Sequence, residues 1–239
     1  LPPPEHEARL RTRRTTPLRE VFSALFRLYP KRTLLGLILM ASQAFLYNAI
    51  FFTYAMMLTD FYGVPSDQTG YYVLPFALGN VLGPLLLGRL FDTVGRKFMM
   101  VLTYAVSGIL LAISRFLFQQ RHLDATGQTL CWSITFFFAS AAASSAYLTV
   151  AECFPIEVRA LAIAIFYAFG TGIGGVLAPW AFSVLIETGS RDAVLLGYLF
   201  AAALMGLAAV AAAFLGIRSE RQPLESVARP LSWHDEDDA

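Results

Sequence analysis

The sequence is poor in charge, and this scarcity argues against an ordinary soluble domain. Only 15% of its 239 residues are Asp, Glu, Lys or Arg, whereas a soluble domain has about 25%. The hydrophobic fraction is 56%, against about 45–50% in soluble domains, and the mean hydropathy is +0.57. The composition therefore indicates a membrane protein.

Cysteine and net charge are also scarce, which excludes further classes of protein. Cys131 and Cys153 lie within or at the end of apolar runs, so neither a disulfide framework nor a zinc site has support. A formal net charge of +1 gives no basis for nucleic-acid binding. Because no nucleophile and base pair and no metal-ligand set converge, we expect neither an enzyme nor a bound metal or cofactor.

The N-terminal segment, residues 1–32, is polar and arginine-rich and lacks the apolar core of a signal peptide. It begins with Leu1 rather than Met, and we expect it to be a linker within a longer protein. Its second part, about residues 17–29, predicts a short amphipathic helix on the membrane surface. The apolar positions at helical spacing are Leu18, Phe22, Leu25 and Phe26.

Six apolar segments are long enough to cross a membrane, since a helix needs about 20 residues to span a hydrocarbon core of about 30 Å. The bilayer offers no water to backbone N–H and C=O groups, so these segments must be helices. They are residues 33–59, 69–90, 98–118, 129–151, 160–186 and 193–217. The predicted fold class is an all-α membrane protein with six transmembrane helices.

Lys and Arg are distributed unevenly between the two ends of these spans. One end has only Arg115, Arg121 and Arg191. All the others lie at the opposite end, in residues 1–32, in residues 88–97, at Arg159 and in residues 218–239. Because basic residues collect on the cytoplasmic side, we predict a multi-pass protein of the plasma (inner) membrane with both termini cytoplasmic and a disordered tail at 218–239.

The connection between the second and third spans, GRLFDTVGRK, combines two glycines with charges of both signs. Arg96 and Lys97 fit a positive loop, but Asp92 at this depth needs another explanation. Gly88 and Gly95 permit a tight reversal of the chain, and a carboxylate is favoured near the positive end of a neighbouring helix. We predict that Asp92 latches helices together at this end.

A second charged group, AECFPIEVRA, lies at the same predicted end. Glu152 ends the fourth span, where the helix dipole disfavours a negative charge, so it needs a cation, either Arg159 or Arg96. Pro155 stops that helix, and Glu157 and Arg159 flank the start of the next. Ordinary loop charges are the alternative. Two ionic clusters on one face suit a gate.

Polar side chains within the first span follow a helical spacing. Gln43, Tyr47 and Tyr54 share one face, and Asn48 adjoins it. Because polar groups are costly at mid-membrane, we predict that this face lines a solute path. Interhelical hydrogen bonds worth about 1 kcal/mol or less are the structural alternative.

Other polar residues in the spans have two interpretations. Asn80 either contacts a solute or satisfies the backbone freed by Pro84. Tyr147 is the one large polar side chain among the serines and alanines of the fourth span, and we expect it to shape a site. We expect Arg115, one turn from the end of its span, to snorkel outward.

Gly170, Gly172 and Gly175 spell G-x-G-x-x-G. A dinucleotide site needs a strand before this motif, whereas here it lies inside an apolar span. We therefore expect a close-packed point at which a helix bends.

GRLFDTVGRK resembles the signature loop of the major facilitator superfamily, secondary transporters built from two six-helix halves. The resemblance covers residues 17–217 and implies the second half of a twelve-helix fold, with residues 1–32 as the linker between halves. In the family the signature Asp and Arg join an inward-face ionic network that stabilises the outward-facing state, which implies this role for Asp92 and Arg96. Thr93 departs from the family, since many members have a basic residue there.

Two further patterns resemble the sugar porters and neighbouring metabolite and proton symporters. Glu152, Pro155 and Arg159 match E-x-x-P-x-x-x-R, and Gln43 and Asn48 have the spacing of a sugar-contacting helix. The departures are Ser42 in place of a Gln, Tyr147 where a Trp is common, and no P-E-T-K-G after the last span. The architecture is implied more firmly than the sugar.

The resemblance implies transport of a small polar solute, such as a sugar, a polyol or an organic acid, by alternating access, as a proton symporter or a facilitator. Expected partners are the solute, the lipid bilayer and an N-terminal six-helix half. Because no span has an acid at its centre, a proton-coupling carboxylate is expected in that half. The alternatives are an exporter of drugs or amphipathic molecules, consistent with 14% aromatic residues, and a non-transporting receptor or scaffold.

Overall fold

The computed structural model describes residues 17–217 and residue 228. The first half of the predicted linker, residues 1–16, and almost all of the predicted tail lie outside the described residues. The helices are α1 (Leu18–Ser23), α2 (Pro30–Tyr62), α3 (Thr69–Thr93), α4 (Arg96–Gln119), α5 (Ala125–Cys153), α6 (Ile156–Gly172), α7 (Ala178–Glu187) and α8 (Arg191–Leu215). Two π-helical turns, η1 (Ala24–Leu28) and η2 (Ile173–Leu177), extend α1 and join α6 to α7. The described residues form no strand.

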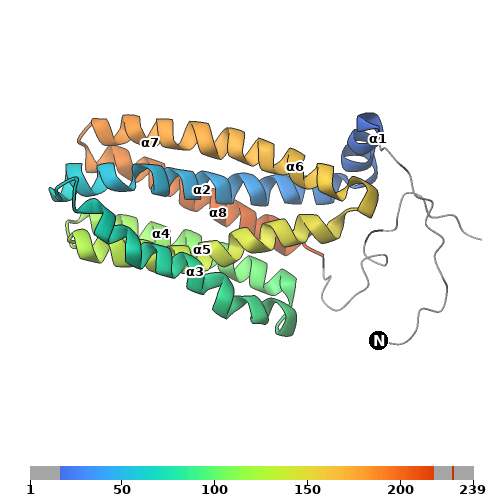
Figure 1. The fold of residues 1–239 in the computed structure, drawn as a ribbon, viewed down its shortest axis with the longest axis horizontal. Helices are drawn as coiled ribbons and strands as arrows, with labels where there is room; N and C mark the ends of the chain where they lie inside the picture. Colours follow the sequence, from blue (N-terminus) through green and yellow to red (C-terminus); the bar gives the residue numbers. More distant parts are fainter. Residues whose placement is uncertain (1–16, 218–227, 229–239) are drawn as a thin grey trace, which may run out of the picture.

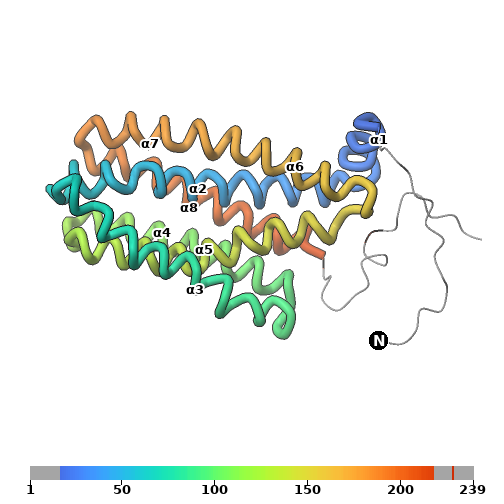
Figure 2. The backbone as a smooth tube through the Cα atoms, viewed as in Figure 1, coloured from blue at the N-terminus to red at the C-terminus, as the bar shows by residue number. Residues whose placement is uncertain are grey.

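Six helices are long and apolar enough to cross a membrane, and they confirm the predicted all-α fold class. They are α2, α3, α4, α5, the continuous unit Ile156–Glu187, and α8. The six run side by side along the long axis of the molecule (Figure 1). The backbone trace places α1 and the last residues of α8 at the same end (Figure 2). This is the arrangement expected of an even number of crossings.

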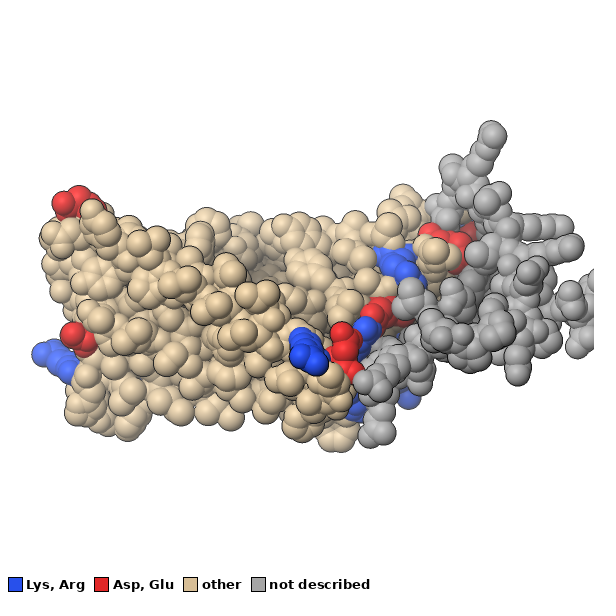
Figure 3. All heavy atoms as spheres, turned by 60° about the horizontal axis from the view of Figure 1, so that its bottom comes forward, with Lys and Arg blue, Asp and Glu red and all other residues tan. Residues whose placement is uncertain are grey.

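Charged side chains gather at the two ends of this bundle. In the face that Figure 3 shows, the wall between the ends carries no Lys, Arg, Asp or Glu. An uncharged wall of this kind fits the hydrocarbon region of a bilayer.

Glycines let α3 approach α5 closely. A Cβ at Gly79 or Gly83 of α3 would overlap the carbonyl oxygens of Ser133 and Phe137 on α5. Because helices within a bilayer associate by close packing rather than by a hydrophobic force, these contacts fix α3 against α5.

The G-x-G-x-x-G segment lies in a helix, as expected, and its neighbourhood contains the π-helical turn η2. Close packing occurs at Gly170 and at Gly174, where a Cβ would press on the backbone of α2. Gly172 has nothing within 4 Å of its Cβ position. The predicted tight packing at Gly172 is therefore wrong, because that position points away from α2.

The segment formed by α1 and η1 divides its apolar residues between two faces. Val21, Ala24 and Leu25 are fully buried against the bundle, whereas Phe22 and Phe26 are about half exposed and stack with centroids 6.1 Å apart. The Thr33 hydroxyl donates to the Leu25 carbonyl at 2.6 Å. Leu25 therefore packs inward, whereas Phe22 and Phe26 remain exposed. The amphipathic helix on the membrane surface stays a prediction.

A leucine at Gly83 should destabilise the fold, because its side chain has no space against the Phe137 carbonyl. We expect Gly83→Leu to cost about 1–3 kcal/mol, the usual effect of overpacking, and to lower the melting temperature of the detergent-solubilised protein. Gly88→Leu on the same helix is the matched control, since nothing lies within 4 Å of that position. Equal melting temperatures for the two variants would contradict the packing described for α3.

Candidate functional site

A cluster of charges joins the α3–α4 connection to the end of α5. The Arg96 guanidinium, at the first residue of α4, forms an ion pair with the Glu152 carboxylate and lies 3.3 Å from an Asp92 carboxylate oxygen. The side chains are unequal in environment: Glu152 is 11% exposed and Asp92 is 65% exposed. Glu152 therefore has its cation in Arg96, one of the two predicted partners.

The tight reversal before α4 depends on one glycine rather than two. Gly95 has φ 121°, a conformation that favours glycine, and it caps the N-terminus of α4. Gly88 lies inside α3 with a helical conformation, so its predicted role in the turn is wrong. Lys97 points elsewhere: its Cγ lies beside Gly216 at the end of α8. A cation there is favoured by the negative end of the α8 dipole.

Two arginines satisfy carbonyl groups where Pro155 interrupts the chain. Arg159 donates from Nε and Nη2 to the Phe154 carbonyl, both at 3.3 Å, and Arg32 donates to the Cys153 carbonyl at 2.7 Å. Arg159 thus serves the α5 terminus and not Glu152. Arg32 was missed at the sequence level, because the positive-inside rule gives it a side of the membrane and no partner. Glu157 lies in the first turn of α6, where a carboxylate is favoured.

A polar cluster connects α2, α3 and α5 within the membrane-spanning region. The Tyr47 hydroxyl donates to the Asn80 side-chain oxygen at 2.7 Å, and the Ser140 hydroxyl donates to the Asn80 backbone carbonyl at 2.6 Å. That carbonyl lacks its helical partner because residue 84, four positions later, is a proline. Ser140 satisfies the freed backbone group, which leaves the Asn80 amide for another role. Ser140 was missed because serines among alanines indicated only close packing.

Further polar residues border this cluster on α5 and α6. Tyr147 of α5 is half-buried, and its ring lies 6.3 Å from the Tyr167 ring of α6, centroid to centroid. Gln43 of α2 is 8% exposed. Ser144, one turn from Ser140, is exposed. Four helices thus contribute to one polar face.

Two predicted members of the face have other surroundings. Asn48 donates to the Ala44 carbonyl of its own helix at 2.7 Å and is half-buried beside Gly175. Tyr54 is only 4% exposed. Its hydroxyl donates to the Tyr72 carbonyl at 2.5 Å and lies 3.2 Å from the Thr129 hydroxyl. Tyr54 is therefore a packing residue, so its predicted place on an open path is wrong.

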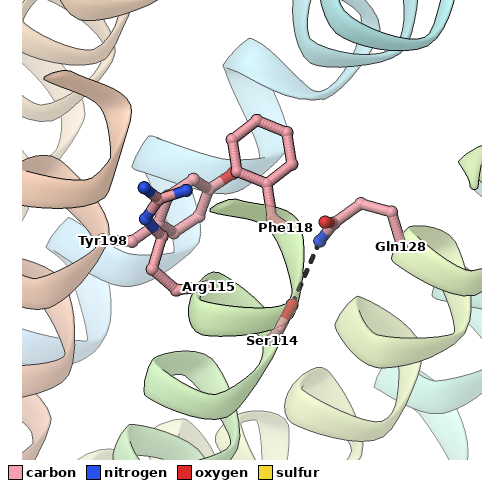
Figure 4. A pocket seen from close by; sticks show the side chains of 5 residues that line it. All are labelled: Ser114, Arg115, Phe118, Gln128 and Tyr198. Carbon is pink, nitrogen blue, oxygen red and sulfur yellow. Dashed lines mark hydrogen bonds between the residues drawn. The ribbon is translucent and has the colours of Figure 1, made fainter. Parts of the chain in front are cut away.

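Arg115 lies inside the opposite end of the bundle and does not snorkel. It is 2% exposed and donates to the Arg191 carbonyl at 2.5 Å. Cα–Cβ bonds tilt toward the N-terminus of a helix, so a side chain near the end of α4 is directed back into the bundle. Figure 4 shows Arg115 beside Tyr198 and Phe118.

The small cavity around Arg115 is not a solute site. Gln128 donates to the Ser114 hydroxyl across it at 3.1 Å (Figure 4), and the enclosing side chains leave no space for a water molecule. Among the described residues, no group of three His, Cys, Asp or Glu side chains is placed to hold a metal ion.

The family model described as Major Facilitator Superfamily matches residues 2–235. No curated protein matches the chain.

Ser140→Ala should destabilise the fold, because it leaves the Asn80 carbonyl without a partner. We expect a cost of about 1–3 kcal/mol, typical of a buried polar group left unsatisfied. Ser133→Ala on the same helix is the matched control, since the Ser133 hydroxyl bonds only the Thr129 carbonyl of its own helix. Unfolding of both variants is followed by melting in detergent, and equal losses would contradict the role assigned to Ser140.

Proposed function

The chain belongs to the Major Facilitator Superfamily, a family of membrane transporters, and from this premise we propose that it moves a small polar solute by alternating access. The solute is a sugar, a polyol or an organic acid, carried by proton symport or by facilitated transport. The chain acts as the second six-helix half of a twelve-helix transporter of the plasma membrane, with both termini cytoplasmic. Membership and the six apolar helices make it an integral multi-pass membrane protein.

The observation that carries this proposal is the polar face shared by four helices. Tyr47 and Asn80 are hydrogen-bonded to each other, and Tyr147 of α5 lies beside Tyr167 of α6. Hydroxyl and amide groups can both donate and accept hydrogen bonds, which suits a solute rich in hydroxyl groups. A receptor or scaffold predicts no continuous polar face across the spans, so the cluster favours transport.

The ionic cluster supplies the gate in this proposal. Arg96 ties the α3–α4 turn to the end of α5 through Glu152. When the cytoplasmic side opens, helices at this end separate, and a tie between them must break. The pair therefore stabilises the state that is closed toward the cytoplasm.

Removing the hydroxyl at Tyr47 should weaken solute binding. In uptake assays of the full-length protein with radiolabelled sugars, polyols and organic acids, we expect Tyr47→Phe and Asn80→Ala to raise KM roughly tenfold, the equivalent of one hydrogen bond of about 1.4 kcal/mol.

Tyr62→Phe is the matched control for Tyr47→Phe. Its hydroxyl also makes a hydrogen bond, to the Gln128 side chain at 3.0 Å, but at the opposite end of the bundle from the ionic cluster. We expect its KM to match that of the wild type. If Tyr47→Phe and Asn80→Ala leave KM unchanged for every transported solute, the polar face does not bind the solute.

Glu152→Gln should impair transport more than Asp92→Asn does. The Glu152 carboxylate is largely buried against Arg96, whereas an exposed pair such as Asp92–Arg96 contributes about 1 kcal/mol or less. We expect uptake to fall about tenfold for Glu152→Gln and at most about fivefold for Asp92→Asn. Glu187→Gln, at the other end of the bundle, is the control. If Glu152→Gln takes up solute at the wild-type rate, the role proposed for this ion pair in the gate is wrong.

A further inference from the structure

Helices α4 and α8 enclose an apolar groove of about 510 Å³ on a face separate from the polar cluster. Val101, Ala105 and Ile109 of α4 form one side, and Gly206, Val210 and Phe214 of α8 form the other. Its rims are exposed: Ile109 is 59% exposed and Phe214 is 82% exposed. Every residue that lines it is apolar.

The groove is hollow because most of the residues that line it are Gly or Ala. At Gly108 a Cβ would lie 3.0 Å from the Ala202 carbonyl oxygen, so the two helices almost touch there. At Gly206 a Cβ would meet nothing within 4 Å. The helices are held close at one point while the missing side chain at Gly206 leaves open space between the projecting rims.

The length of the groove matches one leaflet of a bilayer. On α4 it runs from Val101 to Ala112, and at a rise of about 1.5 Å per residue this is about 17 Å. Half of a hydrocarbon core is about 15 Å thick. The groove starts five residues after Arg96, the first residue of α4, so it lies in the leaflet on the side of the ionic cluster.

Lys97 places a cation at the mouth of the groove. Lys97 precedes Val101 by four residues and so lies on the same face of α4, and its Cγ contacts the backbone end of α8 at Gly216. Among the residues that the structure describes, no carboxylate forms an ion pair with Lys97. Its depth, one helical turn outside the groove, is that of the phosphates of the same leaflet.

We propose that this groove binds one anionic phospholipid of that leaflet, with an acyl chain between α4 and α8 and the phosphate on Lys97. Apolar contact alone gives little preference in a bilayer, because lipid tails are as apolar as the groove. The shape of the groove retains the acyl chain, and Lys97 selects the anionic headgroup. The site is independent of the solute path, so it does not depend on the proposed transport.

Native mass spectrometry of the full chain, released from nanodiscs of phosphatidylglycerol and phosphatidylcholine with identical chains, tests the proposal. We expect one retained lipid per protein, with about fivefold preference for phosphatidylglycerol from one lysine near the headgroup. Gly206→Leu fills the groove and should lower retention about tenfold. Lys97→Gln should keep the lipid and lose the headgroup preference.

The controls separate this site from ordinary lipid contact. Gly172→Leu adds the same side chain at another open position, and Arg89→Gln removes an exposed cation of α3; both should retain lipid like the wild type. Three results would each overturn the proposal. Gly206→Leu could retain as much lipid as the wild type, or Arg89→Gln could also lose the preference for phosphatidylglycerol. The wild type could instead form a lipid-free dimer that Gly206→Leu dissociates. Should Gly206→Leu fail to fold, crosslinking of a diazirine-bearing phosphatidylglycerol to the wild type decides, since labels must map to α4 and α8.

Discussion

Inside a bilayer there is no water to satisfy a polar group, and this constraint determines most of the structure. Each N–H and C=O needs a partner within the protein, which makes the six spans helical. Where proline breaks the pattern, a side chain replaces the missing donor: Ser140 serves the Asn80 carbonyl, and Arg32 and Arg159 serve the carbonyls at the end of α5. Some polar residues that the sequence offers as functional candidates, such as Arg159, therefore satisfy backbone groups.

Two levels of polar groups belong to the proposed function. The polar face of α2, α3, α5 and α6 lies within the membrane-spanning region, and the Arg96–Glu152 pair lies at one end of α4 and α5. Because α5 contributes both Tyr147 and Glu152, a movement that breaks the ion pair also displaces a wall of the polar face. In the proposed function, this shared helix links the solute face to the gate. Helix α4 contributes Arg96 to the ion pair, and its far side forms the apolar groove with α8.

The sequence predicted the six spans and the charged loop, because these follow from length and turn chemistry. It named Tyr47 and Asn80 as separate candidates and did not predict the hydrogen bond between them. It did not predict the direction of Arg115, which depends on the tilt of a Cβ at the end of a particular helix. It placed Tyr54 on the same face as Tyr47, but helical spacing gives no depth of burial, and Tyr72 and Thr129 enclose that hydroxyl. It also assigned the turn to Gly88 and Gly95 alike, although only a backbone φ distinguishes them. Only the burial of Tyr54 is decided by contacts between distant helices; the other two depend on local backbone geometry.

The central claim is that the polar face is in contact with water within the membrane. Ser144 is exposed on that face and Ile113 is 51% exposed on α4, so cysteines at the two positions can be compared in a protein whose Cys131 and Cys153 have been replaced. The measurement is the rate of reaction with a membrane-impermeant thiol reagent in the bilayer. The account predicts that Ser144→Cys reacts with the reagent and that saturating solute slows this reaction. It also predicts that Ile113→Cys stays unlabelled. Equal rates at the two positions, or no reaction at Ser144→Cys, would contradict it.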